Sequence, residues 1–136
     1  MERDDELECL ARIAIDCGYH LHKELGPGLL ESIYEILMAE ELRARGLDCR
    51  KQVPVPIRYN SVVVDNAFKI DLLIENRLVI ELKSVERRSP VHAKQLLTYI
   101  RLMQLPLGLL MNFGMATFKD GLSRIANEYR SGWRSE

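Results

Sequence analysis

The sequence has few cysteines and no long hydrophobic run. Its three cysteines, Cys9, Cys17 and Cys49, are an odd number, and their spacing fits no zinc motif. Cys17 falls on the apolar stripe of an expected helix, so we interpret it as a buried free thiol, as is typical of a reducing compartment. No apolar stretch reaches the roughly 20 residues of a membrane span, and residues 1–6 lack the apolar core of a secretory signal. We therefore expect a cytoplasmic protein without a membrane segment.

The sequence also lacks an excess of charge of either sign. It has 19 Lys and Arg residues and 20 Asp and Glu residues, which gives a formal net charge of −1. This balance excludes a protein that coats nucleic acid through bulk positive charge, but it does not exclude an enzyme with a local acidic metal site. A chain of 136 residues, 47% of them hydrophobic, can build one core and not two full domains. We expect a single domain over residues 1–136, with a polar tail after about residue 129.

Two helices are predicted in the first third of the chain. Apolar residues at steps of three and four predict a helix that begins at Asp4 or Asp5 and ends at residues 26–28, where Gly-Pro-Gly follows. A second helix is expected from about Leu29 to Gly46. Its face toward the core would be apolar and would consist of Leu30, Ile33, Leu37 and Met38.

The pattern then changes to strands and returns to a helix. Prolines at 54 and 56 alternate with apolar residues, which predicts an edge strand, because proline cannot donate to a sheet ladder. Further elements are a strand at 62–74, a strand at 78–84, a helix at 90–104, a strand at 107–113, and a strand or helix start at 122–126. This order predicts an α/β (α+β) fold, a mixed sheet with helices packed against it.

The segment between residues 68 and 83 alternates apolar and charged side chains. Outside the turn at residues 75–77 its even positions are apolar, whereas its odd positions include Lys69, Asp71, Glu81 and Lys83. Alternate residues of a strand share a face, so one face would be core and the other would carry the charges. A three-residue loop centred on Asn76 keeps apolar residues opposite apolar ones, and it places Asp71 opposite Glu81 and Lys69 opposite Lys83.

Two opposed carboxylates beside a lysine indicate a metal-assisted reaction. Directly opposed side chains have Cβ atoms roughly 5 Å apart, so Asp71 and Glu81 would repel each other unless a hard cation such as Mg²⁺ neutralised them. Lys83 could orient a water molecule and stabilise charge on a phosphate. Together they supply what phosphodiester hydrolysis needs. The alternative is a pair of charged residues on a solvated sheet face, and periodicity alone does not separate the two.

Four short motifs resemble one family. Asp71 followed by Glu81-Leu82-Lys83 resembles the signature of the PD-(D/E)XK nuclease superfamily. Within it, residues 28–34 (GLLESIY) resemble the motif of the small bacterial GxxExxY family. Residues 95–99 (QLLTY) and 109–114 (LLMNFG) resemble two further elements of that family. The resemblance spans about Leu7 to Ile125, and four motifs in the right order identify the chain as a member.

The resemblance implies a role for each matching position. Glu31, Asp71 and Glu81 would hold the metal, and Lys83 would be the catalytic lysine. The residues that contact or support the substrate would be Gln95, Tyr99 and Lys69. Gln95 and Tyr99 are four residues apart and share one helix face, although a surface glutamine beside a core-edge tyrosine remains an alternative. At residue 69 we expect arginine to be commoner in the family.

The expected function follows from this resemblance. It implies a restriction-endonuclease-like core and hydrolysis of phosphodiester bonds, in DNA, with Mg²⁺ or Mn²⁺ as cofactor. A homodimer is left open. The alternative is a non-catalytic module that uses the same fold to bind a nucleic acid or a protein.

Overall fold

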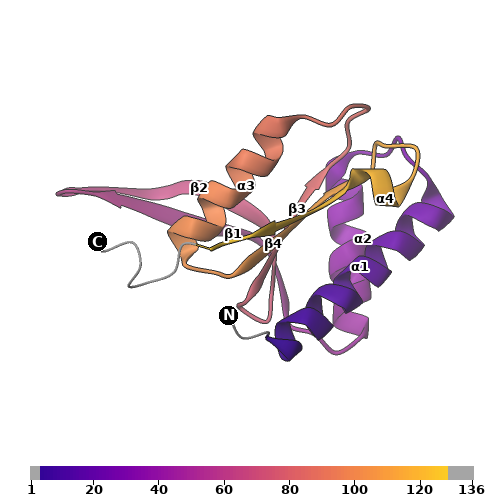
Figure 1. Ribbon diagram of the computed structural model, residues 1–136, viewed down its shortest axis with the longest axis horizontal. Helices are drawn as coiled ribbons and strands as arrows, with labels where there is room; N and C mark the ends of the chain where they lie inside the picture. The colour runs from indigo at the N-terminus through magenta and orange to yellow at the C-terminus, as the bar shows by residue number, and fades with distance from the viewer. Residues whose placement is uncertain (1–3, 129–136) are drawn as a thin grey trace.

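Five strands form one mixed sheet in the computed structural model, which describes residues 4–128 (Figure 1). The strand order follows the chain. Neighbouring strands are antiparallel except β3 and β4, which run parallel. The strands are β1 (Cys49–Tyr59), β2 (Val62–Ile74), β3 (Leu78–Lys83), β4 (Leu107–Asn112) and β5 (Leu122–Ala126). The predicted mixed sheet with flanking helices is therefore confirmed, and residues 122–126 form a strand.

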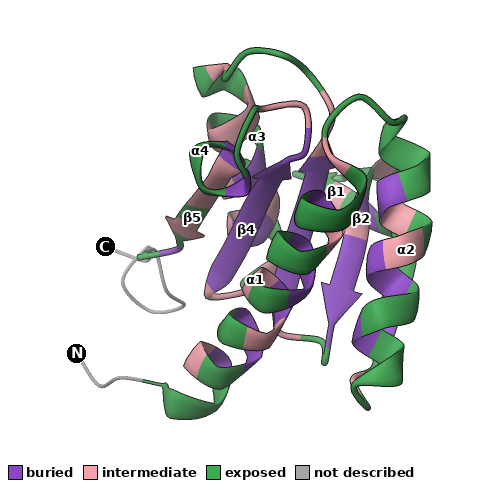
Figure 2. Cartoon of the chain, turned by 90° about the vertical axis from the view of Figure 1, so that its right-hand side faces the viewer, coloured by how far each residue is buried: buried purple, intermediate pink, exposed green. Residues whose placement is uncertain are grey.

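Helices cover both faces of the sheet. Helices α1 (Asp5–Leu25) and α2 (Glu31–Ala44) pack on one face, and α3 (Pro90–Met103), which connects the parallel strands, packs on the other (Figure 1). A short helix, α4 (Phe118–Gly121), joins β4 to β5. Figure 2 shows the buried strands behind α1 and α2. Burial on both faces explains why β4 is apolar up to its last residue, Asn112.

The helix boundaries agree with the sequence prediction more closely than the buried face of α2 does. Asp4 caps α1, because its Oδ1 accepts from the Leu7 N–H at 3.0 Å. The predicted apolar face of α2 is only partly right, since Met38 is buried but Leu30 is 72% exposed. The helix instead buries a stripe with four-residue spacing, which consists of Tyr34, Met38 and Leu42, and it leaves Ile33 exposed.

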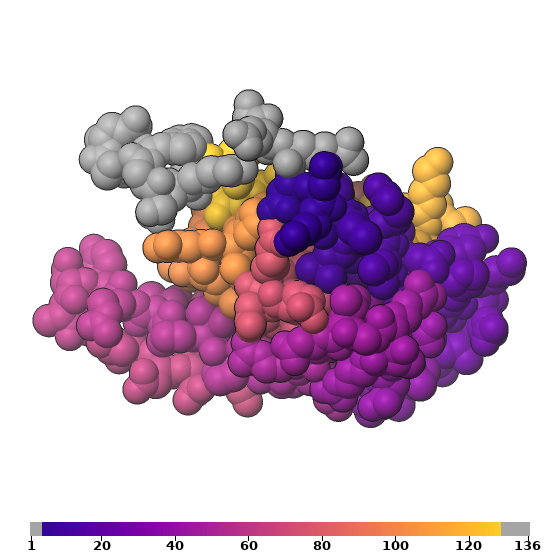
Figure 3. All heavy atoms as spheres, turned by 90° about the horizontal axis from the view of Figure 1, so that it is seen from below, coloured from indigo at the N-terminus to yellow at the C-terminus, as the bar shows by residue number. Residues whose placement is uncertain are grey.

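The predicted register of the β2–β3 hairpin is confirmed. Ile74 pairs with Leu78, and the ladder continues to the pair Leu72–Ile80, where it ends. Beyond that point β2 pairs only with β1, as a two-stranded ribbon (residues 53–70) that projects at the left of Figures 1 and 3. The two strands that carry the candidate acids therefore part at the position of those acids.

The divergence of β2 and β3 overturns one expected pairing. Lys69 does not lie opposite Lys83: it pairs with Pro54 on β1, and Lys83 pairs with Asn112 on β4. The expected division into a core face and a charged face is also too simple. The odd-numbered face carries a second core under α3, which includes Leu73, Val79, Leu96 and Ile100.

No helix within residues 4–128 is long and apolar enough to cross a membrane. The polar tail expected after about residue 129 lies outside the described residues.

Candidate active site

The side chains of Asp71 and Glu81 interlock where β2 and β3 part. The N–H of Asp71 donates to Glu81 Oε1 at 3.0 Å. The N–H of Leu82 donates to Asp71 Oδ2 at 2.8 Å. Each carboxylate thus accepts a hydrogen bond from a backbone N–H group of the opposite strand. Both N–H groups lie beyond the last residue pair of the β2–β3 ladder. The structure brings the two acids together and fixes their orientation through the backbone.

Burial disfavours the charged form of both acids. Glu81 is only 8% exposed, and its burial, reinforced by the neighbouring Asp71 carboxylate, raises its pKa to about 8. Burial also raises the pKa of Asp71, against the lowering effect of its hydrogen bonds with Leu82 and Gln52. At neutral pH the pair therefore favours a bound proton or another compensating positive charge.

Lys83 supplies part of this positive charge. It ends β3, two residues after Glu81, and it is half-buried. Its charge lowers the pKa of Glu81, Asp71 and Glu31, in each case against a larger effect of burial. The ammonium group thus lies within electrostatic range of all three expected metal ligands.

Glu31 reaches the same region from the start of α2. Burial raises its pKa, and the charges of Lys83 and Asp71 act on it in opposite directions. Within the part of the chain that is described, no hydrogen bond joins Glu31 to either acid of the pair. Glu31 is therefore a neighbour of the pair from a different element, positioned by the α1–α2 loop.

Tyr99 of α3 lies within electrostatic range of the acid pair. Burial raises the pKa of Tyr99, and the charges of Glu81 and Asp71 raise it further, whereas a hydrogen bond with Gln95 lowers it. The Tyr99 ring stacks on Phe68 of β2, with centroids 4.0 Å apart and planes at 9°. Gln95 and Tyr99 thus lie beside the acid pair. Lys69, the next residue after Phe68, is exposed on the ribbon.

Sequence reasoning missed one residue that contacts the pair. Gln52 of β1 donates from Nε2 to Asp71 Oδ1 at 3.2 Å and to Glu35 Oε1 of α2 at 2.8 Å. Its backbone has a φ of 51°, which is rare for a residue with a side chain. The only sequence signal for this contact is the place of Gln52 on the strand next to β2. An alternating pattern of apolar and polar residues cannot indicate a positive φ.

The donor set suits a cation that keeps some of its water. Across residues 4–128, no three His, Cys, Asp or Glu side chains form a ready-made metal cluster. Mg²⁺ is usually bound through one or two carboxylates, with water and substrate oxygens completing its shell. Asp71 and Glu81 provide two such carboxylates, and the high pKa of Glu81 marks a place where positive charge is favourable. These residues therefore fit Mg²⁺ or Mn²⁺.

Comparison with known proteins identifies a family. A family model described as "PD-(D/E)XK nuclease superfamily" matches residues 8–125. No curated protein and no solved structure matched the chain. The matched range contains every candidate site residue, from Glu31 to Tyr99, and the whole sheet except its last residue.

Proposed function

Because the chain belongs to the PD-(D/E)XK nuclease superfamily, we propose that it hydrolyses phosphodiester bonds in DNA with Mg²⁺ or Mn²⁺. The observation that carries this proposal is the interlocked acid pair of half-buried Asp71 and buried Glu81, with Lys83 beside it. Within the superfamily we assign the chain to the GxxExxY family, on the motifs at residues 28–34, 95–99 and 109–114.

The acids are proposed to hold the cation. Asp71 and Glu81 would bind it directly, and Glu31 would add a carboxylate from α2. A divalent cation there would supply a Lewis acid and a more acidic bound water. The hydrogen bonds from the backbone of Asp71 and Leu82 preorganise the pair, so the acids need little rearrangement.

The remaining residues are proposed to act on the substrate. Lys83 would donate to the attacking water or to a phosphate oxygen, where its charge stabilises the transition state. Gln95 and Tyr99 would orient the substrate from α3, and Tyr99 is held by its stack on Phe68. Lys69 would contact the phosphate backbone from the ribbon.

A nuclease assay with matched variants tests this function. Purified protein is incubated with single- and double-stranded DNA and RNA, with Mg²⁺, Mn²⁺ or a chelator. We expect DNA cleavage that needs the cation and is lost in Asp71→Asn, because that change removes a ligand charge and keeps the side-chain shape. The control is Asp65→Asn, the same substitution at an exposed position of the same strand, which should cleave as the wild type does.

One outcome would replace the nuclease with a binding module. Folded wild-type protein that binds DNA but leaves it uncut with every divalent cation tested would contradict the proposal. The near-neutral net charge of −1 means that such binding would depend on local basic residues. Cleavage of RNA alone would keep the reaction class and contradict only the choice of DNA.

A further inference from the structure

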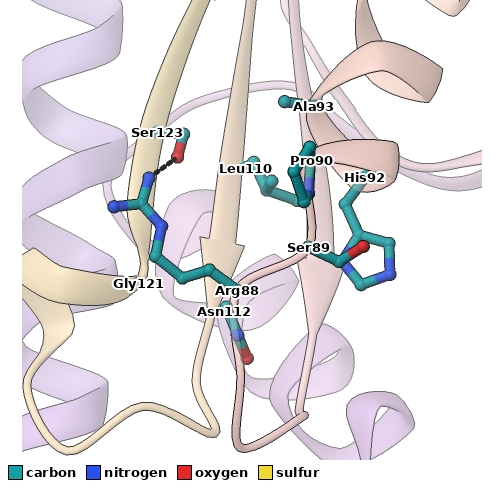
Figure 4. A pocket seen from close by; sticks show the side chains of 9 residues that line it. All are labelled: Arg88, Ser89, Pro90, His92, Ala93, Leu110, Asn112, Gly121 and Ser123. Atoms are coloured by element: carbon teal, nitrogen blue, oxygen red, sulfur yellow. Dashed lines mark hydrogen bonds between the residues drawn. The ribbon is translucent and has the colours of Figure 1, made fainter.

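A small cavity lies beside the candidate active site, at the start of α3 (Figure 4). Its volume is about 220 Å³, below the roughly 300–1,000 Å³ of typical small-molecule sites. It therefore suits a compact group better than a whole nucleoside. The residues of its wall on which the inference depends are Arg88, Ser89, Leu110, Asn112 and Ser123.

The charge of the cavity is positive, and its wall contains no Asp or Glu. Arg88 donates from Nη2 to Ser123 Oγ at 2.9 Å, which holds the guanidinium over β5 (Figure 4). Among residues 4–128, Arg88 has no ion-pair partner. The hydroxyl of Ser89, at the N-cap of α3, makes no capping hydrogen bond. An uncompensated arginine and a free hydroxyl at a helix N-terminus favour an anion.

A buried amide adds an independent indication of a ligand. Asn112 is only 5% exposed, and its Oδ1 accepts from the N–H groups of Val85 and Gly114, both at 3.0 Å. These two bonds fix the amide orientation. The Nδ2 group, at the cavity wall, has no hydrogen-bond partner within the described chain. This N–H group is open to the cavity, where an oxyanion would accept a hydrogen bond from it.

The cavity faces the same side of the sheet as the acid pair. Asn112 pairs in register with Lys83 across the parallel strands β3 and β4, which are about 4.8 Å apart. Leu110, also in the cavity wall, pairs with Glu81. Register partners of parallel strands project to the same face. A polynucleotide bound at the acid pair could therefore place a neighbouring phosphate over the cavity.

We propose that this cavity binds a phosphate group of the substrate other than the one that is cleaved. Arg88 would provide the charge, and Asn112 Nδ2 and the Ser89 hydroxyl would donate hydrogen bonds. Assignment of the phosphate to a polynucleotide rests on the proposed nuclease function, whereas the binding of phosphate itself does not. The phosphate is either a strand end or an internal phosphodiester.

Inorganic phosphate tests the cavity without any cleavage. Titration of ¹⁵N-labelled protein, in chelator, should shift the side-chain amide signals of Asn112. Loss of a charged hydrogen-bonding partner should weaken this binding about tenfold or more in Arg88→Ala. The control is Arg87→Ala, because Arg87 is an adjacent exposed arginine that does not line the cavity. A second variant, Asn112→Asp, keeps Oδ1 and replaces the Nδ2 donor with a carboxylate oxygen. It should therefore also lose phosphate binding.

The outcomes separate this inference from the nuclease proposal. Absent shifts at Asn112, or equal weakening in the two arginine variants, would overturn the cavity assignment even if DNA is cut. Specific binding in a protein that cuts nothing would keep the phosphate cavity and leave only the proposed reaction contradicted. Thermal unfolding of each variant checks that the fold is intact.

Short DNA strands with a 5′-phosphate, a 3′-phosphate or neither then identify the source of the phosphate. If Arg88→Ala weakens the binding only of a strand that carries a terminal phosphate, the cavity binds that end of the strand. If it weakens all three equally, the cavity binds an internal phosphodiester. Equal binding of all strands by wild type, Arg87→Ala and Arg88→Ala would show that the cavity makes no contact with the substrate, and would overturn the proposal.

Discussion

Glu81 is buried beside the half-buried carboxyl group of Asp71, so its ionised form is disfavoured at neutral pH unless a positive charge compensates it. Burial and the Asp71 carboxylate raise the pKa of Glu81 to about 8, even though Lys83 acts in the opposite direction. One lysine therefore compensates the pair incompletely. This residual preference for positive charge is what a divalent cation would satisfy, and it leaves the ammonium group of Lys83 available to a substrate.

At this scale, Lys83→Ala should separate catalysis from cation binding. A protonated lysine is not a metal ligand, so its loss should leave the stabilisation by Mg²⁺ unchanged or slightly larger. Removal of a preorganised group that stabilises the transition state typically reduces the rate by about 10²–10³. We expect a loss of this size in DNA cleavage, measured beside the Mg²⁺-dependent shift in melting temperature.

Lys119→Ala is the control, because Lys119 is an exposed lysine on α4. It should match the wild type in both measurements. Equal rates in wild type and Lys83→Ala would remove Lys83 from the mechanism, while weaker DNA binding without any cleavage would favour the non-catalytic module.

The approach of Asp71 to Glu81 could be predicted, and the contact with Gln52 could not. The hairpin register follows from alternation and loop length, because any slip by one residue would bury charges. Gln52 reaches Asp71 because its backbone has a positive φ and because β1 pairs with β2. Neither feature shows in the hydrophobic periodicity of the sequence. The Lys69–Lys83 pairing failed because the hydrophobic pattern does not show where two strands part.

At the scale of elements, Tyr34 fixes the loop that presents Glu31. Its side chain is fully buried, its hydroxyl donates to Gly26 O at 2.5 Å, and it accepts from the Leu29 N–H at 3.3 Å. The ring stacks on Phe113, with centroids 4.4 Å apart. One residue thus joins the end of α1, the start of α2 and the segment after β4.

Tyr34→Phe should destabilise the protein and loosen this loop. The ring packing is retained, but two backbone groups lose their partner, which costs about 1–2 kcal/mol of unfolding free energy. Urea unfolding measures this cost, and faster hydrogen exchange of the Leu29 amide would show that the loop has loosened. Tyr19→Phe, at an exposed tyrosine of α1, should be nearly neutral. A neutral Tyr34→Phe would mean that water replaces the hydroxyl.

Elements with strong local signals were predicted well. Caps and proline mark the helices, and alternation marks the strands. The stripe of α2 was misassigned because Leu30 and Ile33 are apolar yet exposed, and only the position of the sheet decides which face is covered. The identity of residues 122–126 was open, since pairing with β4, a distant contact, makes them a strand. The four-residue α4 is too short to show a period.

For the whole molecule, the acid pair links stability to pH. Glu81 is buried in the folded protein, so unfolding exposes it to water and returns its pKa to about 4.5 from about 8. The folded state therefore binds a proton that the unfolded state releases over this range. The cytoplasmic location stays a prediction, and a homodimer stays open.

In chelator, the free energy of unfolding should fall as the pH rises between these two values. A carboxyl whose folded pKa is raised stabilises the fold fully below its unfolded pKa and loses that contribution as the pH passes the folded pKa. The raised pKa of Asp71 acts in the same direction. For one proton, the fall in the free energy of unfolding approaches about 1.4 kcal/mol per pH unit. Urea unfolding from about pH 5 to about pH 8 measures it.

The Glu81→Gln variant should flatten this dependence, because glutamine has no proton to lose in the range. Glu86→Gln, at an exposed site on the loop after β3, should keep the wild-type slope. Mg²⁺ should reverse the trend in the wild type: it binds the ionised acids of the folded state only, so the stability that it adds grows with pH. A wild-type stability in chelator that rises steadily toward pH 8 would show that the acids are ionised without a cation, which would remove the electrostatic reason for placing one between them.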